Sequence, residues 1–197
     1  MGSKRNVLAG ATLAAVATMA AACGQAAQAH TTGSVGKSTK TGTSSSVSAQ
    51  EENAVYGKCL TRYVHAAPGI AQGTAGSVYQ VIVFKNLDNV PCHIDGYPQI
   101  NVAHGLPIHL RGLASTHEQG TTAHPIRVPA YGYFHVVLRL VDPGNYKTSS
   151  CKPIHTNWVQ LLFPGEGSPL YFPLQANSCA KIHTMSVGPF QSGKGTV

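Results

Sequence analysis

Acidic residues are scarce in this chain of 197 residues, which contains 7 Asp and Glu against 14 Lys and Arg. From residue 55 onward the carboxylates are Asp88, Asp95, Glu118, Asp142 and Glu166. The three Asp residues lie in turn-forming sequences, where an Asp side chain stabilises the local backbone. No two of the five carboxylates have the spacing of an obvious acid/base pair, which argues against hydrolase chemistry. We therefore expect that the protein is not an enzyme.

Motifs for covalent catalysis and phosphate binding are also missing. The sequence contains no Gly-x-Ser-x-Gly motif. Residues 73–77 are rich in glycine but lack the helix and the lysine that follow a phosphate-binding loop. The basic residues are scattered, so the sequence predicts no nucleic-acid partner. The net charge of +7 suits anionic wall polymers or lipid headgroups as partners, but it also suits ordinary solubility.

Residues 1–22 are typical of a bacterial lipoprotein signal peptide. Lys4 and Arg5 precede an uncharged run, residues 7–22, that is shorter than the roughly 20 residues of a membrane-spanning helix. Cys23 follows three alanines, an arrangement that resembles a lipobox. The alternative is an ordinary signal peptide cleaved near an incidental cysteine. We expect a diacylglyceryl and palmitate anchor on Cys23, which would hold the protein at the extracytoplasmic face of the cell membrane.

Residues 23–54 form the expected tether between this anchor and the folded domain. Residues 24–48 consist mainly of Ala, Gln, Thr, Gly and Ser, with two valines as the large aliphatic side chains. Such a segment buries too little apolar surface to offset its ordering entropy, so we expect it to be disordered. The folded domain is then residues 55–197, which is long enough for one hydrophobic core.

The cysteines predict two disulfides in the folded domain. Lipidation of Cys23 leaves four thiols, and an even number in an exported chain indicates disulfide pairing. Three connectivities are possible. We expect the simplest, in which Cys59 pairs with Cys92 and Cys151 pairs with Cys179.

Short apolar segments separated by Gly and Pro predict an all-β domain. The expected strands are residues 58–64, 78–85, 91–94, 99–102, 108–110, 126–128, 133–140, 157–163, 170–172 and 182–187. Residues 77–98 are interpreted as a central hairpin, and residues 65–76 as a loop. In the segment 133–140, alternate positions are apolar and face one side. This pattern indicates an antiparallel β-sandwich, with a closed barrel as the main alternative.

Three residues near the C-terminus have the side-chain types of a copper site: Cys179, His183 and Met185. Copper ligation needs a free thiolate, whereas Cys179 has an expected disulfide partner in Cys151. We therefore expect Met185 to pack in the core, and the sequence predicts no cofactor.

Histidines provide a second possible metal site. His104 and His109 flank one expected turn and could converge with His117 or His124 on zinc or copper. Extracytoplasmic metal binding is therefore the alternative function, although loop histidines are more often ordinary surface residues.

Tyrosines near strand ends are the best sequence indication of recognition. A tyrosine ring buries apolar area while its hydroxyl stays hydrated. Tyr97, Tyr131 and Tyr133 are the candidate binding residues. Tyr97 could equally cap one end of the sandwich.

Three blocks of sequence carry a resemblance to a known family. They contain Gly73-Thr74-Ala75-Gly76-Ser77-Val78-Tyr79, Phe84-Lys85-Asn86 and Pro91-Cys92-His93-Ile94-Asp95-Gly96-Tyr97-Pro98. Later segments are Cys151-Lys152-Pro153, Leu161-Leu162-Phe163-Pro164-Gly165 and Val187-Gly188-Pro189-Phe190. Over residues 59–190 the chain resembles the bacterial, mainly actinobacterial, domain of unknown function 4232.

This resemblance implies an immunoglobulin-like antiparallel sandwich with two disulfides, displayed outside the membrane, and it implies no activity. Together with the residues, it leads us to expect a membrane-anchored extracytoplasmic lipoprotein. Its domain would be a non-enzymatic binding or interaction module of the cell envelope. The expected partners are the membrane, through the anchor, and a cell-wall polymer or a protein.

Overall fold

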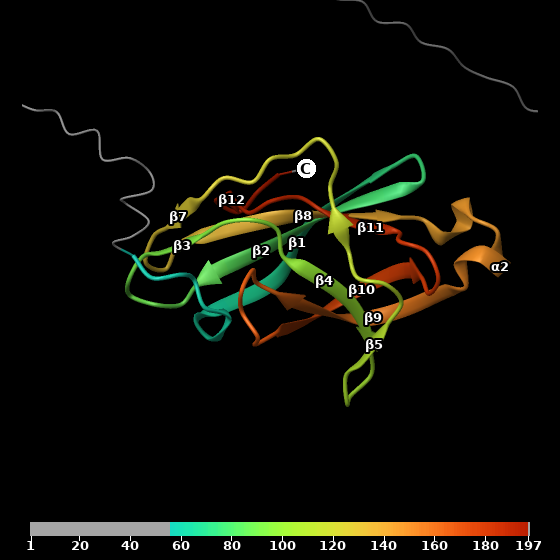
Figure 1. Ribbon diagram of the computed structural model, residues 1–197, viewed down its shortest axis with the longest axis horizontal. Helices are drawn as coiled ribbons and strands as arrows, with labels where there is room; N and C mark the ends of the chain where they lie inside the picture. The colour runs from blue at the N-terminus through green and yellow to red at the C-terminus, as the bar shows by residue number, and fades with distance from the viewer. Residues whose placement is uncertain (1–55, 197) are drawn as a thin grey trace, which may run out of the picture. The chain divides into compact units, whose positions relative to one another are not determined.

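The structure is a computed structural model that describes residues 56–196 (Figure 1). The predicted signal peptide (1–22), the predicted lipidation site Cys23 and the predicted tether (23–54) lie outside the described residues. In the described part of the chain, no helix is long and apolar enough to cross a membrane.

The described residues form three sheets. The largest has the spatial order β1 (Val64–Thr74), β2 (Ser77–Asn86), β8 (Tyr133–Val141), β11 (Met185–Val187) and β6 (Thr116–His117), and β12 (Gln191–Ser192) also pairs with β8. The second has the order β10 (Leu170–Cys179), β9 (Pro153–Leu162), β4 (Gln99–His104) and β5 (His109–Arg111). The third pairs β3 (Cys92–Ile94) with β7 (Ile126–Val128).

Helical structure in the described residues is limited to short turns. They are the 3₁₀ turns η1 (Thr61–Tyr63) and η2 (Pro143–Asn145) and the helix α2 (Thr148–Cys151). The strand pairs are antiparallel apart from β6 with β11. A mostly β fold with two disulfides confirms the predicted class, and the immunoglobulin-like topology stays a prediction.

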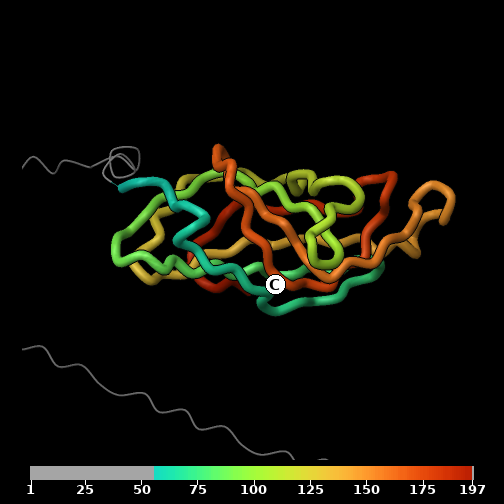
Figure 2. The backbone as a smooth tube through the Cα atoms, turned by 90° about the horizontal axis from the view of Figure 1, so that it is seen from below, coloured from blue at the N-terminus to red at the C-terminus, as the bar shows by residue number. Residues whose placement is uncertain are grey.

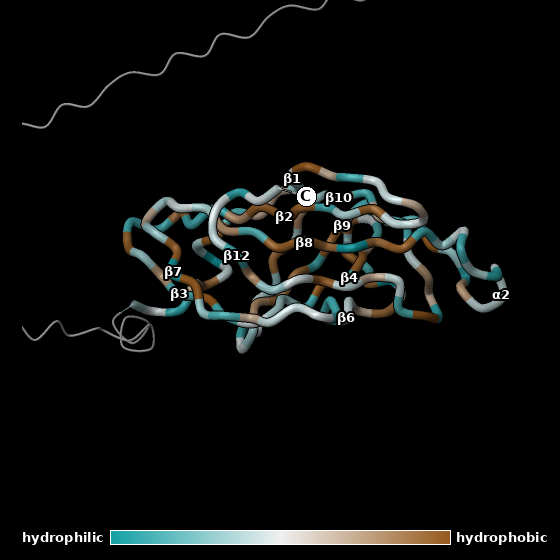
Figure 3. The backbone as a smooth tube through the Cα atoms, turned by 90° about the horizontal axis from the view of Figure 1, so that it is seen from above, coloured by the Kyte–Doolittle hydropathy of each residue, from teal (hydrophilic) through white to brown (hydrophobic). Residues whose placement is uncertain are grey.

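One hydrophobic core lies between the two larger sheets. Residues of β2 and β8, such as Ile82 and Val136, join residues of β4 and β9, such as Val102 and Val159, in a single buried cluster. The tube in Figure 2 shows the layered path of the chain, and Figure 3 shows hydrophobic residues concentrated along β2 and β8. Burial of the apolar surface of these side chains is the main favourable contribution to folding.

Four phenylalanines form the centre of this core. Phe84 of β2 stacks on Phe134 of β8, with their ring centroids 4.8 Å apart. Phe163, just after β9, and Phe190, just before β12, meet edge to face at 5.3 Å. Because these rings come from four separate segments, they join both sheets to the C-terminal part of the chain.

The predicted alternation in β8 is confirmed. Phe134, Val136, Leu138 and Leu140 are all buried on one face. His135, on the opposite face, is also buried, because the C-terminal segment covers it and its Nδ1 lies 3.1 Å from the Gly193 carbonyl oxygen. The outer face of the sheet is therefore partly covered by the chain's own end.

Two predictions at the start of the domain are wrong. Residues 58–64 are not a strand, because η1 occupies much of this segment and β1 begins at Val64. Residues 65–76, predicted as a loop, lie largely within β1. β1 is an edge strand with a register shift between Pro68 and Ala71. An edge strand tolerates proline at a bulge, because the N–H that proline lacks is not needed for a hydrogen bond to a neighbouring strand there.

The predicted central hairpin over residues 77–98 is also wrong. β2 is a central strand as expected, but its partners are β1 and β8. β3 pairs with β7, because the intervening loop turns the chain away from β2. Two other strands extend beyond their predictions: β10 runs to Cys179 instead of ending at residue 172, and β9 starts at Pro153.

Candidate functional site

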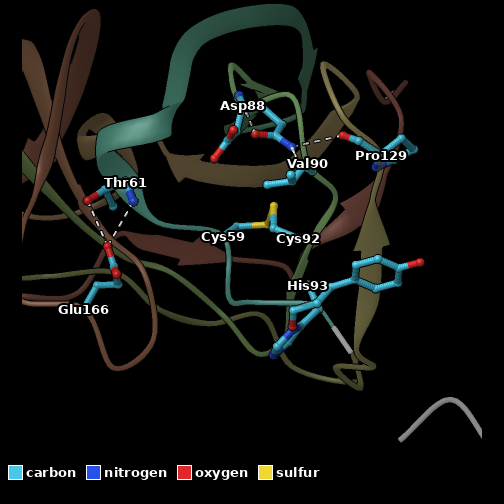
Figure 4. Close-up of a disulfide and its surroundings, with 10 residues drawn as sticks. Cys59, Thr61, Asp88, Val90, Cys92, His93, Pro129 and Glu166 are labelled. Carbon is cyan, nitrogen blue, oxygen red and sulfur yellow. Dashed lines mark hydrogen bonds between the residues drawn. A yellow bond between two sulfur atoms is a disulfide. The ribbon is translucent and has the colours of Figure 1, made fainter. Parts of the chain in front are cut away.

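The disulfide between Cys59 and Cys92 organises one end of the domain (Figure 4). The Cys59 N–H donates to the His93 carbonyl oxygen at 2.9 Å, and the His93 N–H donates to the Gly57 carbonyl oxygen at 3.0 Å. The start of the described chain therefore lies along β3. The second disulfide joins Cys151 of α2 to Cys179 at the end of β10. Both predicted pairs are thus present.

A turn after β9 is held against this end by Glu166. The Glu166 Oε2 atom accepts hydrogen bonds from the Thr61 N–H at 3.0 Å and from the Thr61 hydroxyl at 2.9 Å. Figure 4 shows both contacts beside the disulfide. They connect η1 to the turn that carries Pro164. The Glu166 carboxylate therefore has a structural role, with Thr61 as its partner.

Two hollows lie on either side of this turn. The first has a volume of about 480 Å³ and is lined by groups that include Lys58, His93, Asp95 and Pro164. The second has a volume of about 530 Å³ and is lined by Tyr97, His117 and the same proline, among others. We call them the paired hollows, because Pro164 and Glu166 contribute to both. Residues 93–96 line the first hollow, and Tyr97 and Pro98 continue into the second.

Tyr97 is fixed in the second hollow by two contacts. Its ring stacks on the His117 ring, with centroids 4.2 Å apart and planes 13° apart. Its hydroxyl donates to the Thr121 carbonyl oxygen at 2.8 Å. His117 is exposed, so its imidazole offers a ring face and a polar edge to a bound molecule. The sequence did not identify His117 as a partner of Tyr97, because the two residues meet only through the tertiary fold.

A third hollow, of about 560 Å³, shares His117 with the second and contains Arg139. The Arg139 guanidinium lies 6.0 Å from the centre of the Tyr79 ring, and its buried Nε has no hydrogen-bond partner among the described residues. The Ser186 hydroxyl donates to the Glu118 carboxylate nearby. Arg139 therefore brings a positive charge to this hollow, which also contains the Glu118 carboxylate.

The five carboxylates predicted to be non-catalytic all accept hydrogen bonds. Asp88, Asp95 and Asp142 accept from the backbone N–H groups of Asn89, Gly96 and Gly144, which confirms their predicted role in turns. Glu118 and Glu166 accept from hydroxyl groups, as described above. The three Asp residues therefore stabilise local turns, and the two Glu residues join segments that are far apart in the chain.

The structure places Tyr131 and Tyr133 in a different region, at the turn from β7 to β8. Tyr131 is exposed and has a φ angle of 56°. Tyr133 lies beneath Lys194, whose Nζ is 4.4 Å from the ring centre. The three predicted binding tyrosines thus do not form one site.

The copper candidates do not converge. Cys179 is bonded to Cys151, and Met185 is buried in the core as predicted. His183 is exposed, and its Nδ1 lies 2.9 Å from the Ala114 carbonyl oxygen.

The histidine candidates are brought together only as a pair. His104 and His109 are directly opposite each other on β4 and β5. Among residues 56–196, no group of three His, Cys, Asp or Glu side chains could hold a metal ion.

These features define a class of protein: a mostly β domain with two disulfides and open surface hollows lined by polar and aromatic groups. Residues 59–191 match the family model described as Domain of unknown function (DUF4232). The chain therefore belongs to that family. No curated protein matches the chain.

Proposed function

We propose that the protein is a lipoprotein, anchored at the extracytoplasmic face of the membrane through Cys23, whose β domain binds a cell-wall polymer without chemical turnover. The observation that carries the binding proposal is the position of the paired hollows, which adjoin at Pro164 and present Lys58, His93 and the Tyr97–His117 stack.

The arrangement of the hollows favours an extended ligand. The first hollow adjoins the second at Pro164 and Glu166, and the second adjoins the third at His117. Each is open to solvent, whereas sites for small molecules bury most of the ligand surface. A polymer could contact successive hollows, and the cationic groups Lys58 and Arg139 would favour one with negative charge.

The hydrogen bonds of the carboxylates support the absence of turnover. A general acid or base needs a titratable group positioned toward the reacting atoms. Glu166 instead holds the turn that separates the paired hollows, and Asp95 stabilises the backbone at Gly96. Export and anchoring are supported by the signal-like residues 1–22 and by the position of Cys23.

Sedimentation with purified insoluble cell walls tests the binding proposal. The chain should sediment with the walls without releasing soluble fragments, and His117→Ala should weaken binding by roughly tenfold, the effect of losing a moderate interface contact. His109→Ala is the matched control, because His109 is also an exposed histidine but lies on β5. Release of wall fragments, or equal losses in the two variants, would contradict the proposal.

A further inference from the structure

Four large apolar or aromatic side chains are exposed together near the Cys59–Cys92 disulfide. We call them the apolar tip: Tyr63, Leu87, Val90 and Tyr131, which are 43%, 50%, 53% and 57% exposed. The Leu87 N–H donates to the Tyr63 carbonyl oxygen at 2.7 Å, and the Tyr131 N–H donates to the Asp88 carbonyl oxygen at 3.2 Å. Three separate segments therefore contribute to one surface. Contiguous exposed apolar surface is unusual unless something covers it.

Asn86 holds these segments in place from beneath. Its side chain is buried, and its Nδ2 donates to the carbonyl oxygens of Val90 at 3.0 Å and Pro129 at 3.1 Å. Its Oδ1 accepts from the Asp88 N–H at 3.0 Å. Figure 4 shows Asp88, Val90 and Pro129 gathered on one side of the disulfide, with His93 on the other. The apolar tip is therefore preorganised.

Tyr131 gives a second indication of function at the tip. Its φ angle of 56° lies in the left-handed region, which a residue with a bulky side chain seldom occupies. The backbone bond to Asp88 holds this conformation, while the ring stays exposed to solvent. Backbone strain of this kind is concentrated at binding and functional sites.

Cationic side chains lie over aromatic rings at the apolar tip and next to it. The Arg62 guanidinium lies 4.8 Å from the Tyr63 ring centre. Lys85 and Lys194 lie 5.9 Å and 4.4 Å from the ring centre of Tyr133, two residues after Tyr131. Asp88 is the acidic residue within these segments, and its Oδ1 accepts from the Asn89 N–H. The surface therefore combines apolar side chains with nearby positive charge.

We propose that the apolar tip docks directly on an anionic lipid bilayer, with its tyrosines and aliphatic side chains at the headgroup boundary. Tyrosine favours this boundary, and Lys and Arg are attracted to anionic headgroups. Arg62, Lys85 and Lys194 complement such a surface, whereas a second copy would bring like charges together. This interaction goes beyond the proposed function, because it needs neither the lipid on Cys23 nor the paired hollows.

The path of the chain is compatible with this orientation. Gly57, near the start of the described residues, lines a hollow of about 200 Å³ together with Tyr63 and Val90. The described part of the chain therefore begins beside the apolar tip. The composition of residues 24–55 predicts a coil with a mean reach of about 30 Å, and a coil of that length would keep the tip within reach of the bilayer proposed to hold Cys23.

Vesicle sedimentation tests the proposal with residues 23–197, Cys23→Ser, so that the chain has no lipid but keeps both disulfides. The chain should bind phosphatidylglycerol vesicles, bind phosphatidylcholine vesicles weakly, and be released by high salt. Leu87→Ser and Tyr131→Gly should each weaken binding about tenfold, because each removes one inserted side chain. Glycine is the conservative choice at position 131, since it adopts positive φ without strain.

Leu110→Ser is the matched control, because Leu110 is 52% exposed and lies on β5. The Leu110→Ser variant should bind vesicles as the unsubstituted chain does. The His117→Ala variant should do the same, and this result would separate vesicle binding from wall binding. Unfolding transitions should show that all variants are folded. Absence of binding to phosphatidylglycerol, or equal losses in Leu87→Ser and Leu110→Ser, would overturn the proposal. The proposal would also be overturned if the chain formed a dimer and Leu87→Ser abolished that dimer.

Discussion

Asn86 shows how one polar side chain shapes a surface. It lies at the end of β2, and its amide satisfies backbone groups in both the loop before β3 and the turn before β8. Its own N–H donates to the Gly132 carbonyl oxygen at 2.9 Å. A buried amide that is fully hydrogen-bonded specifies one arrangement of its neighbours, because any other arrangement leaves polar groups unpaired.

Asn86→Ala should lower the free energy of unfolding by about 2–3 kcal/mol, because backbone groups at Asp88, Val90 and Pro129 lose their partner. Urea denaturation of the purified domain measures the change. Asn89→Ala is the control: Asn89 is exposed, and its substitution should change stability by less than about 0.5 kcal/mol. Equal destabilisation by the two substitutions would refute this role of Asn86.

At the scale of the secondary structure, the edge strands β1 and β10 have one feature in common. β1 has a register shift after Pro68, and β10 has one after Pro173. Each strand is at the edge of its sheet, so its proline interrupts pairing on one side only. Bulges and prolines on edge strands also discourage pairing with other chains. The same prolines misled the sequence interpretation. It assigned the segment around Pro68 to a loop, and it ended the later strand just before Pro173.

The two disulfides close loops of similar length, with sequence separations of 33 and 28. Replacing either pair by alanine should therefore cost a similar amount, about 3–4 kcal/mol in the chain-entropy model. Their effects on binding should differ, because Cys59 lines the first of the paired hollows. Only the Cys59→Ala, Cys92→Ala variant should lose wall binding, as measured at a temperature where both variants are folded.

At the scale of the whole molecule, the proposed contacts are close to one another. Lys58 and Cys59 line both the first of the paired hollows and the smaller hollow beside the apolar tip. The core lies between the larger sheets, so the loops at this end contribute surface and leave the packing of the strands intact. Binding residues carried on loops of a rigid scaffold are a common solution in β domains.

The proposed anchor predicts a change in the location of the whole protein. In cells, Cys23→Ala should move the protein out of the membrane fraction after a high-salt wash and should abolish incorporation of labelled palmitate, because the thiol that would carry the lipid is gone. Gln28→Ala is the control, since it alters a nearby residue and leaves the thiol. Retention of the Cys23→Ala variant in salt-washed membranes would contradict the anchor.

The sequence was a good guide to individual elements and a poor one to their partners. The segments predicted around β2, β4, β5, β7 and β8 are strands, because β-branched runs and turn residues act locally. β3 was assigned to β2 as its hairpin partner, yet it pairs with β7. Tyr97 was proposed as a binding residue, but nothing local could indicate that His117 stacks on it.

The sequence by itself determined the mostly β class, the membership of the family and the turn roles of three aspartates, and it left three disulfide connectivities open. Each depends on composition, on short motifs or on interactions between near neighbours. The tertiary structure alone decided which strands pair, how Asn86 joins two loops, and where hollows and exposed side chains meet. These depend on contacts between residues far apart in the chain, whose free energy comes from packing and burial and leaves no local pattern.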